Sequence, residues 1–136
     1  MESLGPVTGV EGKLVVNGVF PDSIKGVLVA AFESDVDFKN AAEYLVDYSG
    51  VLENGNDSIS YFLQLFDGSF TLAPIGLSMD PAFVIANFDS LLQAPILPII
   101  DLIGDDPIKK AELSRVVGVR RESVREVSTI YMEFGP

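Results

Sequence analysis

The chain has 136 residues, about the size of one domain, and 48% of them are hydrophobic while 21% are charged. This balance predicts a folded globule with one hydrophobic core, because a disordered chain is poorer in apolar residues. Nine basic and 20 acidic residues give a net charge of -11, which argues against DNA, RNA or an anionic membrane surface as a partner.

Two residue types that dominate enzyme and metal sites are missing. The chain has no cysteine, which excludes disulfides, thiolate nucleophiles and zinc-thiolate sites. It has no histidine, which excludes the Ser-His-Asp and Cys-His hydrolases and any histidine-ligated metal. We therefore expect no catalytic residue and no cofactor, apart from the calcium hypothesis discussed below.

The domain organisation expected from the sequence is simple. Residues 1–8 should form a loose leader, without the basic region and apolar core of a signal peptide. Residues 91–103 are the most apolar stretch, but they are too short to span a bilayer and are interrupted by Pro95, Pro98 and Asp101. We expect no membrane span and a single domain over residues 9–136, with an insertion around residues 76–115.

Alternating apolar residues predict the first two strands at residues 10–17 and 24–33. In the second strand Val27, Val29 and Ala31 share one face, while Leu28, Ala30 and Phe32 share the other. Since both faces are apolar, this strand should lie in the centre of a sheet that is covered on both sides.

Residues 34–58 give no clear pattern. One interpretation is a short helix capped by Asp37 that carries Ala41, Ala42, Leu45 and Tyr48 on one side and ends at Gly50. Helices are also expected at residues 82–92 and 108–115, because Asp80-Pro81 and Asp106-Pro107 each place an N-capping aspartate before a proline.

The Asp67-Gly68 pair is the strongest local signal. It lies between predicted strands at residues 59–66 and 69–75, and a two-residue Asp-Gly loop suits a type I′ hairpin. Further strands are expected at residues 116–120 and 126–134. Together these elements predict an all-β antiparallel sandwich of about seven strands with one or two short inserted helices.

The strand sequences resemble those of the prealbumin-like sandwich, the fold of transthyretin-like and carboxypeptidase regulatory-like domains. The similarity is carried by the segments Gly12-Lys13-Leu14-Val15-Val16, Val27-Leu28-Val29-Ala30-Ala31-Phe32, Tyr61-Phe62-Leu63-Gln64-Leu65 with Asp67-Gly68-Ser69-Phe70, and Val127-Ser128-Thr129-Ile130-Tyr131-Met132-Glu133-Phe134. The resemblance implies an exported or cell-surface bacterial domain.

One enzymatic branch of that superfamily, the hydroxyisourate hydrolases, relies on histidines and an arginine and ends in Tyr-Arg-Gly-Ser. This chain has no histidine and ends Tyr131-Met132-Glu133-Phe134-Gly135-Pro136. The resemblance therefore implies no catalytic residue here, and it does not cover residues 75–115.

Acidic clusters raise the question of calcium. Asp35, Asp37 and Asp57 are the candidate ligands, because calcium prefers carboxylate and carbonyl oxygens on loops. Their spacing does not fit an EF-hand, and a solvated acidic loop is the interpretation we favour. A calcium site would raise the melting temperature in millimolar calcium. Asp101, Asp105 and Asp106 form a second acidic group, in which Asp106 is explained as a helix cap.

The apolar segment around residues 94–100 is the candidate interaction surface, with Ile96, Leu97, Ile99 and Ile100 as its residues. Its simpler interpretation is a loop packed over one face of a sheet. If Ile99→Asp dissociates a dimer and stays folded, the segment is an interface between subunits. If Ile99→Asp unfolds a monomer, the segment belongs to the core.

The expected function is non-catalytic: an accessory or interaction domain of an exported bacterial protein, acting through protein or ligand contact. Three alternatives stay open at this point. A carbohydrate-binding module would use exposed tyrosines, and a carboxylate-dependent hydrolase would need two acids facing each other in a cleft. A homo-oligomer would self-associate through the apolar segment. The arginines at 115, 120, 121 and 125 are expected to pair with neighbouring acids within the chain.

Overall fold

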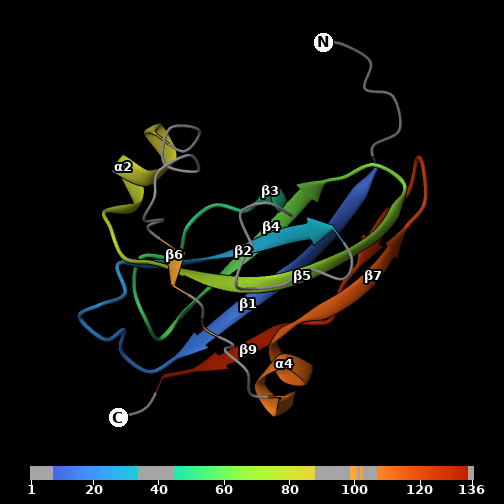
Figure 1. Cartoon of the computed structure of the whole chain (residues 1–136). Coiled ribbons are helices and arrows are strands. Elements are labelled where there is room, and N and C mark those ends of the chain that lie inside the picture. The colour runs from blue at the N-terminus through green and yellow to red at the C-terminus, as the bar shows by residue number, and fades with distance from the viewer. Residues whose placement is uncertain (1–7, 34–44, 88–98, 101, 103–106, 135–136) are drawn as a thin grey trace.

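The computed structural model describes residues 8–33, 45–87, 99–100, 102 and 107–134. Figure 1 shows the elements found there, mainly strands with two short helices. In chain order they are β1 (Gly9–Asn17), β2 (Gly26–Glu33), β3 (Leu45–Tyr48), β4 (Asp57–Gln64), β5 (Gly68–Leu77), α2 (Pro81–Ala86), β6 (Ile99–Ile100), α4 (Pro107–Leu113), β7 (Arg115–Val119), β8 (Val124–Glu126) and β9 (Ile130–Glu133).

The strands form two sheets, which confirms the predicted all-β sandwich. In the 4-stranded sheet, β1 is central: β4 pairs with it antiparallel, and β8 and β9 pair with its other edge. In the 5-stranded sheet the order is β3-β2-β5, with β6 and β7 both paired to the far edge of β5. All pairings are antiparallel except those of β8 and β9 with β1, which are parallel and were not predicted.

The last strand, predicted as one run, is divided by a bulge. Glu11 lies opposite Glu126 and Leu14 lies opposite Ile130, so residues 127–129 face only two residues of β1. The backbone N–H of Val127 still donates to the carbonyl of Glu11 at 2.8 Å. One extra residue in a strand bends it locally, so the direction of β9 differs from that of β8.

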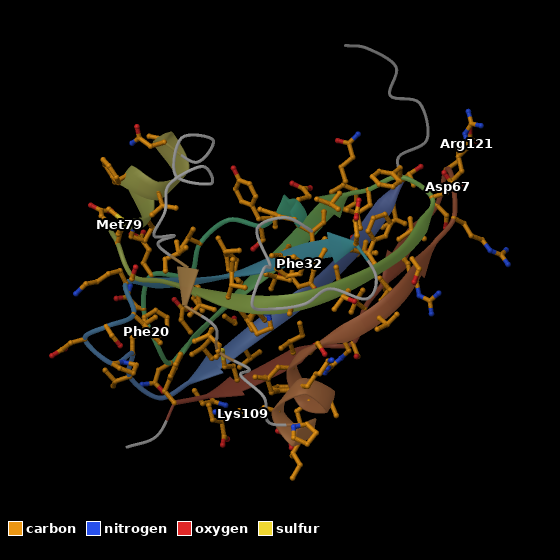
Figure 2. All side chains as sticks on the ribbon, viewed as in Figure 1. Phe20, Phe32, Asp67, Met79, Lys109 and Arg121 are labelled. Carbon is orange, nitrogen blue, oxygen red and sulfur yellow. The ribbon has the colours of Figure 1, made fainter. Side chains whose placement is uncertain are left out.

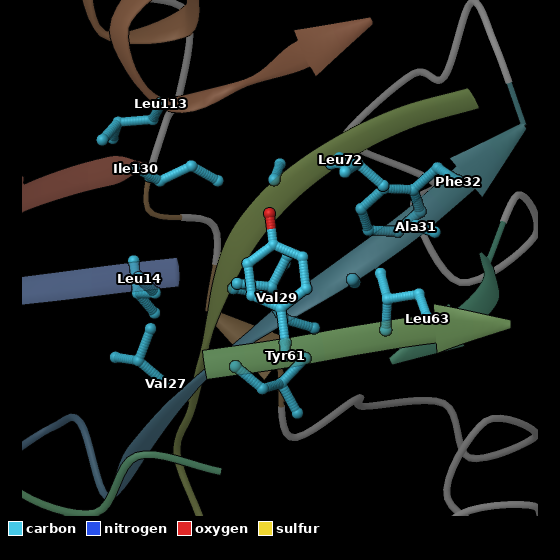
Figure 3. Close-up of a cluster of buried hydrophobic side chains, with 14 of the residues drawn as sticks. Leu14, Val27, Val29, Ala31, Phe32, Tyr61, Leu63, Leu72, Leu113 and Ile130 are labelled. Carbon is cyan, nitrogen blue, oxygen red and sulfur yellow. The ribbon is translucent and has the colours of Figure 1, made fainter. Parts of the chain in front are cut away.

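The core lies between the sheets and is built by alternation along the strands. Figure 3 shows Leu14, Tyr61, Leu63 and Ile130 of the 4-stranded sheet meeting residues of β2 and β5. Leu14, Leu63 and Ile130 are fully buried, as are Val27, Val29 and Leu72 opposite them. Leu28, Ala30 and Phe32 on the other face of β2 are buried too, which confirms that this strand is covered on both sides.

The predicted hairpin at Asp67-Gly68 is wrong. β4 belongs to the 4-stranded sheet and β5 to the 5-stranded sheet, so the chain crosses between the sheets at this corner. Gly68 has a φ of 148°, but Asp67 is not among the residues with positive φ, which a type I′ turn requires. The reason is burial: β5 is covered on both faces and fits only a central position between β2 and β7.

The helix proposed from Asp37 to Gly50 is also wrong in its second half. Leu45 and Tyr48 lie in strand β3, which extends the edge of β2. Where β3 ends, buried Ser49 continues the ladder: its N–H donates to the carbonyl of Val29 at 2.8 Å, and its hydroxyl accepts from the Val29 N–H at 2.9 Å. The first half of that proposed helix lies outside the described residues.

The two Asp-Pro signals are followed by helices. Asp80 caps α2, its carboxylate accepting from the backbone N–H of Ala82 at 3.0 Å, and Val84 is buried against the sandwich. α2 ends at Ala86, earlier than predicted, and α4 begins at Pro107 as expected. Across the described ranges, no helix combines the length and apolar character that a membrane crossing needs.

Tyr61 is the one buried polar side chain in the described residues whose hydroxyl has no hydrogen-bond partner. Its ring fills the core next to Gly12, where a Cβ atom would lie 2.5 Å from the hydroxyl oxygen. Burial raises the pKa of Tyr61 above its ordinary value, and the positive charge of Arg115 lowers it in part. A desolvated hydroxyl without a partner costs stability of about 1–3 kcal/mol.

We therefore predict that Tyr61→Phe stabilises the protein by about 1 kcal/mol, because it removes an unsatisfied polar atom and keeps the ring. The measurement is urea unfolding. Tyr131→Phe is the matched control, since Tyr131 is 64% exposed and its hydroxyl is hydrated in both states. A loss of stability in Tyr61→Phe would mean that the hydroxyl has a partner in solution.

The pH dependence tests the same residue. Because its pKa is raised in the folded state, the unfolded chain releases the Tyr61 proton first as the pH rises. The raised pKa thus leaves stability unchanged below about pH 10 and lowers it above that pH, where the tyrosine ionises more readily in the unfolded chain. Unfolding free energy should fall less steeply above about pH 10 in Tyr61→Phe than in the wild type. Equal slopes would contradict the burial argument.

Candidate functional site

A cleft between α4 and β9 is the candidate functional site. It has a volume of about 760 Å³ and opens at the side of the sandwich where the helix lies next to the last strand (Figure 1). The charged residues that line it in the described part of the chain are Lys109, Glu112, Arg115 and Glu133. Apolar and aromatic residues complete the lining, namely Leu102, Leu113, Tyr131, Met132 and Phe134.

Helix α4 forms one wall. Pro107 starts it with a φ already suited to a helix, and buried Leu113 anchors its end to the sandwich. The last turn is closed by Ser114, whose N–H donates to the carbonyl of Lys110 at 3.0 Å. Lys109 and Glu112 thereby project from a short, pinned helix along the cleft, and Figure 2 shows Lys109 on this side of the molecule.

Strand β9 and the residue after it form the opposite wall. Ile130 and Met132 point into the core, so Tyr131 and Glu133 point outward, and Tyr131 is 64% exposed. Phe134 is held at the end of the strand: its N–H donates to the carbonyl of Asn17 at 2.9 Å, and its ring meets that of Phe20 edge-on at 5.3 Å. These two contacts hold the wall in place without a ligand.

Arg115 joins the two walls. Its guanidinium donates to the carbonyls of Glu112 at 2.6 Å and Ser114 at 3.0 Å, at the end of α4. It also donates to the Ser128 hydroxyl at 3.0 Å and to the Thr129 carbonyl at 3.4 Å, within the bulge before β9. A planar guanidinium with five N–H donors can make several hydrogen bonds at once. Arg115 therefore holds α4 and the bulge in place beside the cleft, and few of its donors remain for a ligand.

The predicted pairing of the arginines with neighbouring acids takes another form. Arg115 uses the backbone carbonyl of Glu112 instead of its carboxylate, and Arg125 donates to the carbonyl of Gly118 at 3.3 Å. Both side chains donate hydrogen bonds to backbone carbonyls of this chain. They do not form a basic patch for an anion.

Of the described residues that line the cleft, two are basic and two are acidic, in a chain whose net charge is -11. Glu112 lines the cleft from the helix and Glu133 from the strand, and both are exposed. A carboxylate-dependent hydrolase needs two acids that face each other across the bond that is cleaved. The arrangement suits binding: a ring for stacking, with polar groups around it.

The candidate calcium ligands are not brought together by the described structure. Asp57 begins β4, is exposed, and accepts a hydrogen bond from the N–H of Ser58 at 2.8 Å. Asp35 and Asp37 lie outside the described residues, as do Asp101, Asp105 and Asp106. Among the residues that are described, no three acids lie close enough to hold a metal ion. The calcium hypothesis stays a prediction.

The candidate interaction surface is described only in part. The backbone of Ile99 and Ile100 forms β6, which pairs with Gly76 and Leu77 of β5. This backbone therefore extends the sheet and does not lie over its face. Ile96 and Leu97 lie outside the described residues, so the interface at this segment stays a prediction.

Sequence reasoning missed the cleft. From the sequence, Arg115 is expected only to pair with acids and Tyr131 only to lie in the last strand, and neither is assigned to a shared site. A signal did exist: Tyr131 and Glu133 alternate with Ile130 and Met132, which marks them as outward-facing on the last strand. What the sequence lacked was the position of α4 beside that strand.

We predict that Arg115→Met destabilises the protein by about 1–3 kcal/mol, because carbonyl oxygens at the end of α4 and in the bulge lose a charged donor. The stability of Arg115→Lys should lie between those of the wild type and Arg115→Met, because lysine keeps the positive charge but lacks the planar guanidinium with its several donors. The measurement is urea unfolding, with Arg121→Met as control. Arg121 lies exposed at the far end of the molecule (Figure 2), and its loss should cost less than about 0.5 kcal/mol. Equal losses for both methionine variants would contradict the role of Arg115.

Comparisons with protein-family models, with curated proteins and with solved structures found no match to this chain. The roles of the cleft residues thus rest on their own geometry: a helix and a strand held together by Arg115, with Tyr131 exposed between charged neighbours.

Proposed function

We propose that this chain is a non-catalytic binding domain of an exported bacterial protein and that the cleft between α4 and β9 is its contact site. The observation that carries the proposal is the construction of the cleft, in which Arg115 is bonded to backbone carbonyls while Tyr131, Glu112 and Glu133 are exposed. A preformed concave site with an apolar floor and a few polar groups is the usual form of a ligand site.

The prealbumin-like fold and the export of the protein are parts of this proposal. Their support is the resemblance in the strand sequences, together with a two-sheet sandwich built from those same segments. The absence of a nucleic-acid partner is also proposed, and it rests on the net charge of -11.

A screen of the intact protein by thermal shift tests the proposal. Oligosaccharides, peptides and small organic acids are the probes, because any compound that binds only the folded state raises the melting temperature. Compounds that do so are then incubated with the protein and recovered by mass spectrometry. Recovery of unchanged compound supports a binding domain, whereas turnover that is lost in Glu112→Gln or Glu133→Gln would establish the hydrolase alternative.

Carbohydrate is the ligand class that one specific observation favours. The Tyr131 ring is 64% exposed at the cleft, and Glu112 and Glu133, which also line it, offer carboxylate oxygens to hydroxyls. A tyrosine has an apolar ring and a polar hydroxyl, so it is favoured at contact sites that are partly apolar and partly hydrated. This arrangement supports the carbohydrate-binding alternative over a purely apolar contact.

For an oligosaccharide found in that screen, we predict that Tyr131→Ala weakens binding about tenfold or more, because a stacked ring at the centre of a contact is worth more than about 1 kcal/mol. Tyr131→Phe keeps the ring and should bind nearly as well as the wild type. Isothermal titration provides the measurement. Equal affinity in Tyr131→Ala and the wild type would place the sugar elsewhere on the molecule.

A further inference from the structure

The end of β1 meets the segment before β4, and each side of this junction contains an Asn-Gly pair, Asn17-Gly18 and Asn54-Gly55. The backbone N–H of Gly18 donates to the side-chain Oδ1 of Asn56 at 2.8 Å, and the N–H of Asn56 donates to the carbonyl of Gly18 at 3.1 Å. These two bonds continue the antiparallel pairing of β1 with β4 beyond its last pair in register. The two Asn-Gly pairs therefore share one junction, but their surroundings differ.

An asparagine followed by a glycine is open to an intramolecular reaction. The backbone nitrogen of the glycine loses its proton and attacks the side-chain carbonyl carbon of the asparagine, so that a carbon–nitrogen bond forms and ammonia leaves. Water then opens the resulting succinimide ring at either carbonyl, which gives aspartate or isoaspartate. Glycine favours the attack because it has no side chain to shield its nitrogen. The net change replaces the amide nitrogen by an oxygen from water, without an oxidant, a reductant or an enzyme.

Asn17-Gly18 is held in a geometry that opposes this reaction. The nitrogen that would attack is that of Gly18, whose N–H is bonded to Asn56. The asparagine belongs to β1, where it lies opposite Glu133 of β9, and its carbonyl accepts from the N–H of Phe134 at 2.9 Å. Turning the Gly18 nitrogen toward the Asn17 side chain would break the bond to Asn56 and twist the end of β1. The structure therefore protects this pair, although the Asn17 side chain is exposed.

Asn54-Gly55 lacks both restraints. It lies outside the strands, in the turn that leads to β4 at Asp57, and the Asn54 side chain is exposed. The N–H of Gly55 has no hydrogen-bond partner among the described residues. Gly55 also lies against the carbonyl of Gly18, where any side chain would collide, so the position requires glycine. The attacking nitrogen is thus unbonded, unshielded and adjacent to an exposed side-chain amide.

We propose that Asn54 is a site of spontaneous deamidation in the folded protein, that Asn17 is protected from it, and that isoaspartate at residue 54 loosens the junction of β1 with β4. Each event adds one negative charge to a chain that already carries -11. Isoaspartate routes the backbone through the former side chain, which inserts one methylene group before Gly55. The insertion displaces Asn56, and with it the two hydrogen bonds that hold Gly18.

Peptide mass spectrometry after timed incubation of the intact protein at neutral pH tests the proposal. Incubation in heavy-oxygen water marks each event, because the new oxygen comes from the solvent. Digestion is performed in mild acid, where the glycine nitrogen keeps its proton and no further deamidation occurs. Electron-transfer fragmentation assigns the modified residue and distinguishes isoaspartate from aspartate. The same incubation in urea provides the rates of both Asn-Gly pairs without the fold.

The expected result in the folded protein is heavy oxygen at residue 54, gained faster at higher pH, with Asn17 modified several-fold more slowly. In urea both asparagines should react at similar rates, because the hydrogen bond to Gly18 and the strand pairing of Asn17 are lost. A folded protein in which Asn54 stays unmodified, while the chain in urea reacts there, overturns the proposal. So does a folded protein in which Asn17 reacts as fast as Asn54.

Two substitutions at Asn56 test the protection of Asn17 directly. Asn56 has a φ of 52°, which glycine and aspartate both tolerate. Asn56→Gly removes the acceptor of the Gly18 N–H and should speed deamidation at Asn17 several-fold, whereas Asn56→Asp keeps an acceptor and should leave that rate near the wild-type value. Circular dichroism checks the fold of both variants. Equal rates at Asn17 in the two variants would contradict protection by this hydrogen bond.

The effect on the junction is measured by urea unfolding of the isoaspartate form, which is isolated by ion exchange and identified by fragmentation. Asn54→Asp is the matched control, because it carries the same added charge on a backbone of normal length. The isoaspartate form should unfold at a lower urea concentration than Asn54→Asp, since only its backbone displaces Asn56 from Gly18. Equal midpoints for the two forms would overturn the loosening of the junction.

Discussion

The pairing of the first strand with the last is the constraint on which the molecule depends. Among the described strands, β1 joins the whole 4-stranded sheet, with β4 on one edge and β8 and β9 on the other. Gly9 meets Val124 and Leu14 meets Ile130, so nearly the whole described chain must be in place before this edge closes. Such non-local contacts carry a large loop-closure cost, which the burial of Leu14, Val16, Ile130 and Met132 offsets.

The cleft is a consequence of how that last strand is attached. The bulge at residues 127–129 turns β9 relative to β8, and Arg115 bonds the bulge to the end of α4. Removing the bulge would change the positions of Ser128 and Thr129, to which Arg115 donates from the end of α4. The extra residue is thus better understood as part of the site than as an irregularity in the sheet, in keeping with the frequency of bulges next to functional sites.

Most elements could be predicted from the sequence, whereas their partners could not. Alternation of apolar residues located β1 and β4, because one buried face leaves a period of two, whereas β2 was located by an apolar run that occupies both of its faces. Asp67-Gly68 marked a turn correctly but not its type, since a hairpin and a corner between sheets use the same residues. The cleft could not be predicted because the partners of its strands were unknown. α4 and β9 meet only because β9 pairs in parallel with β1, at the other end of the chain.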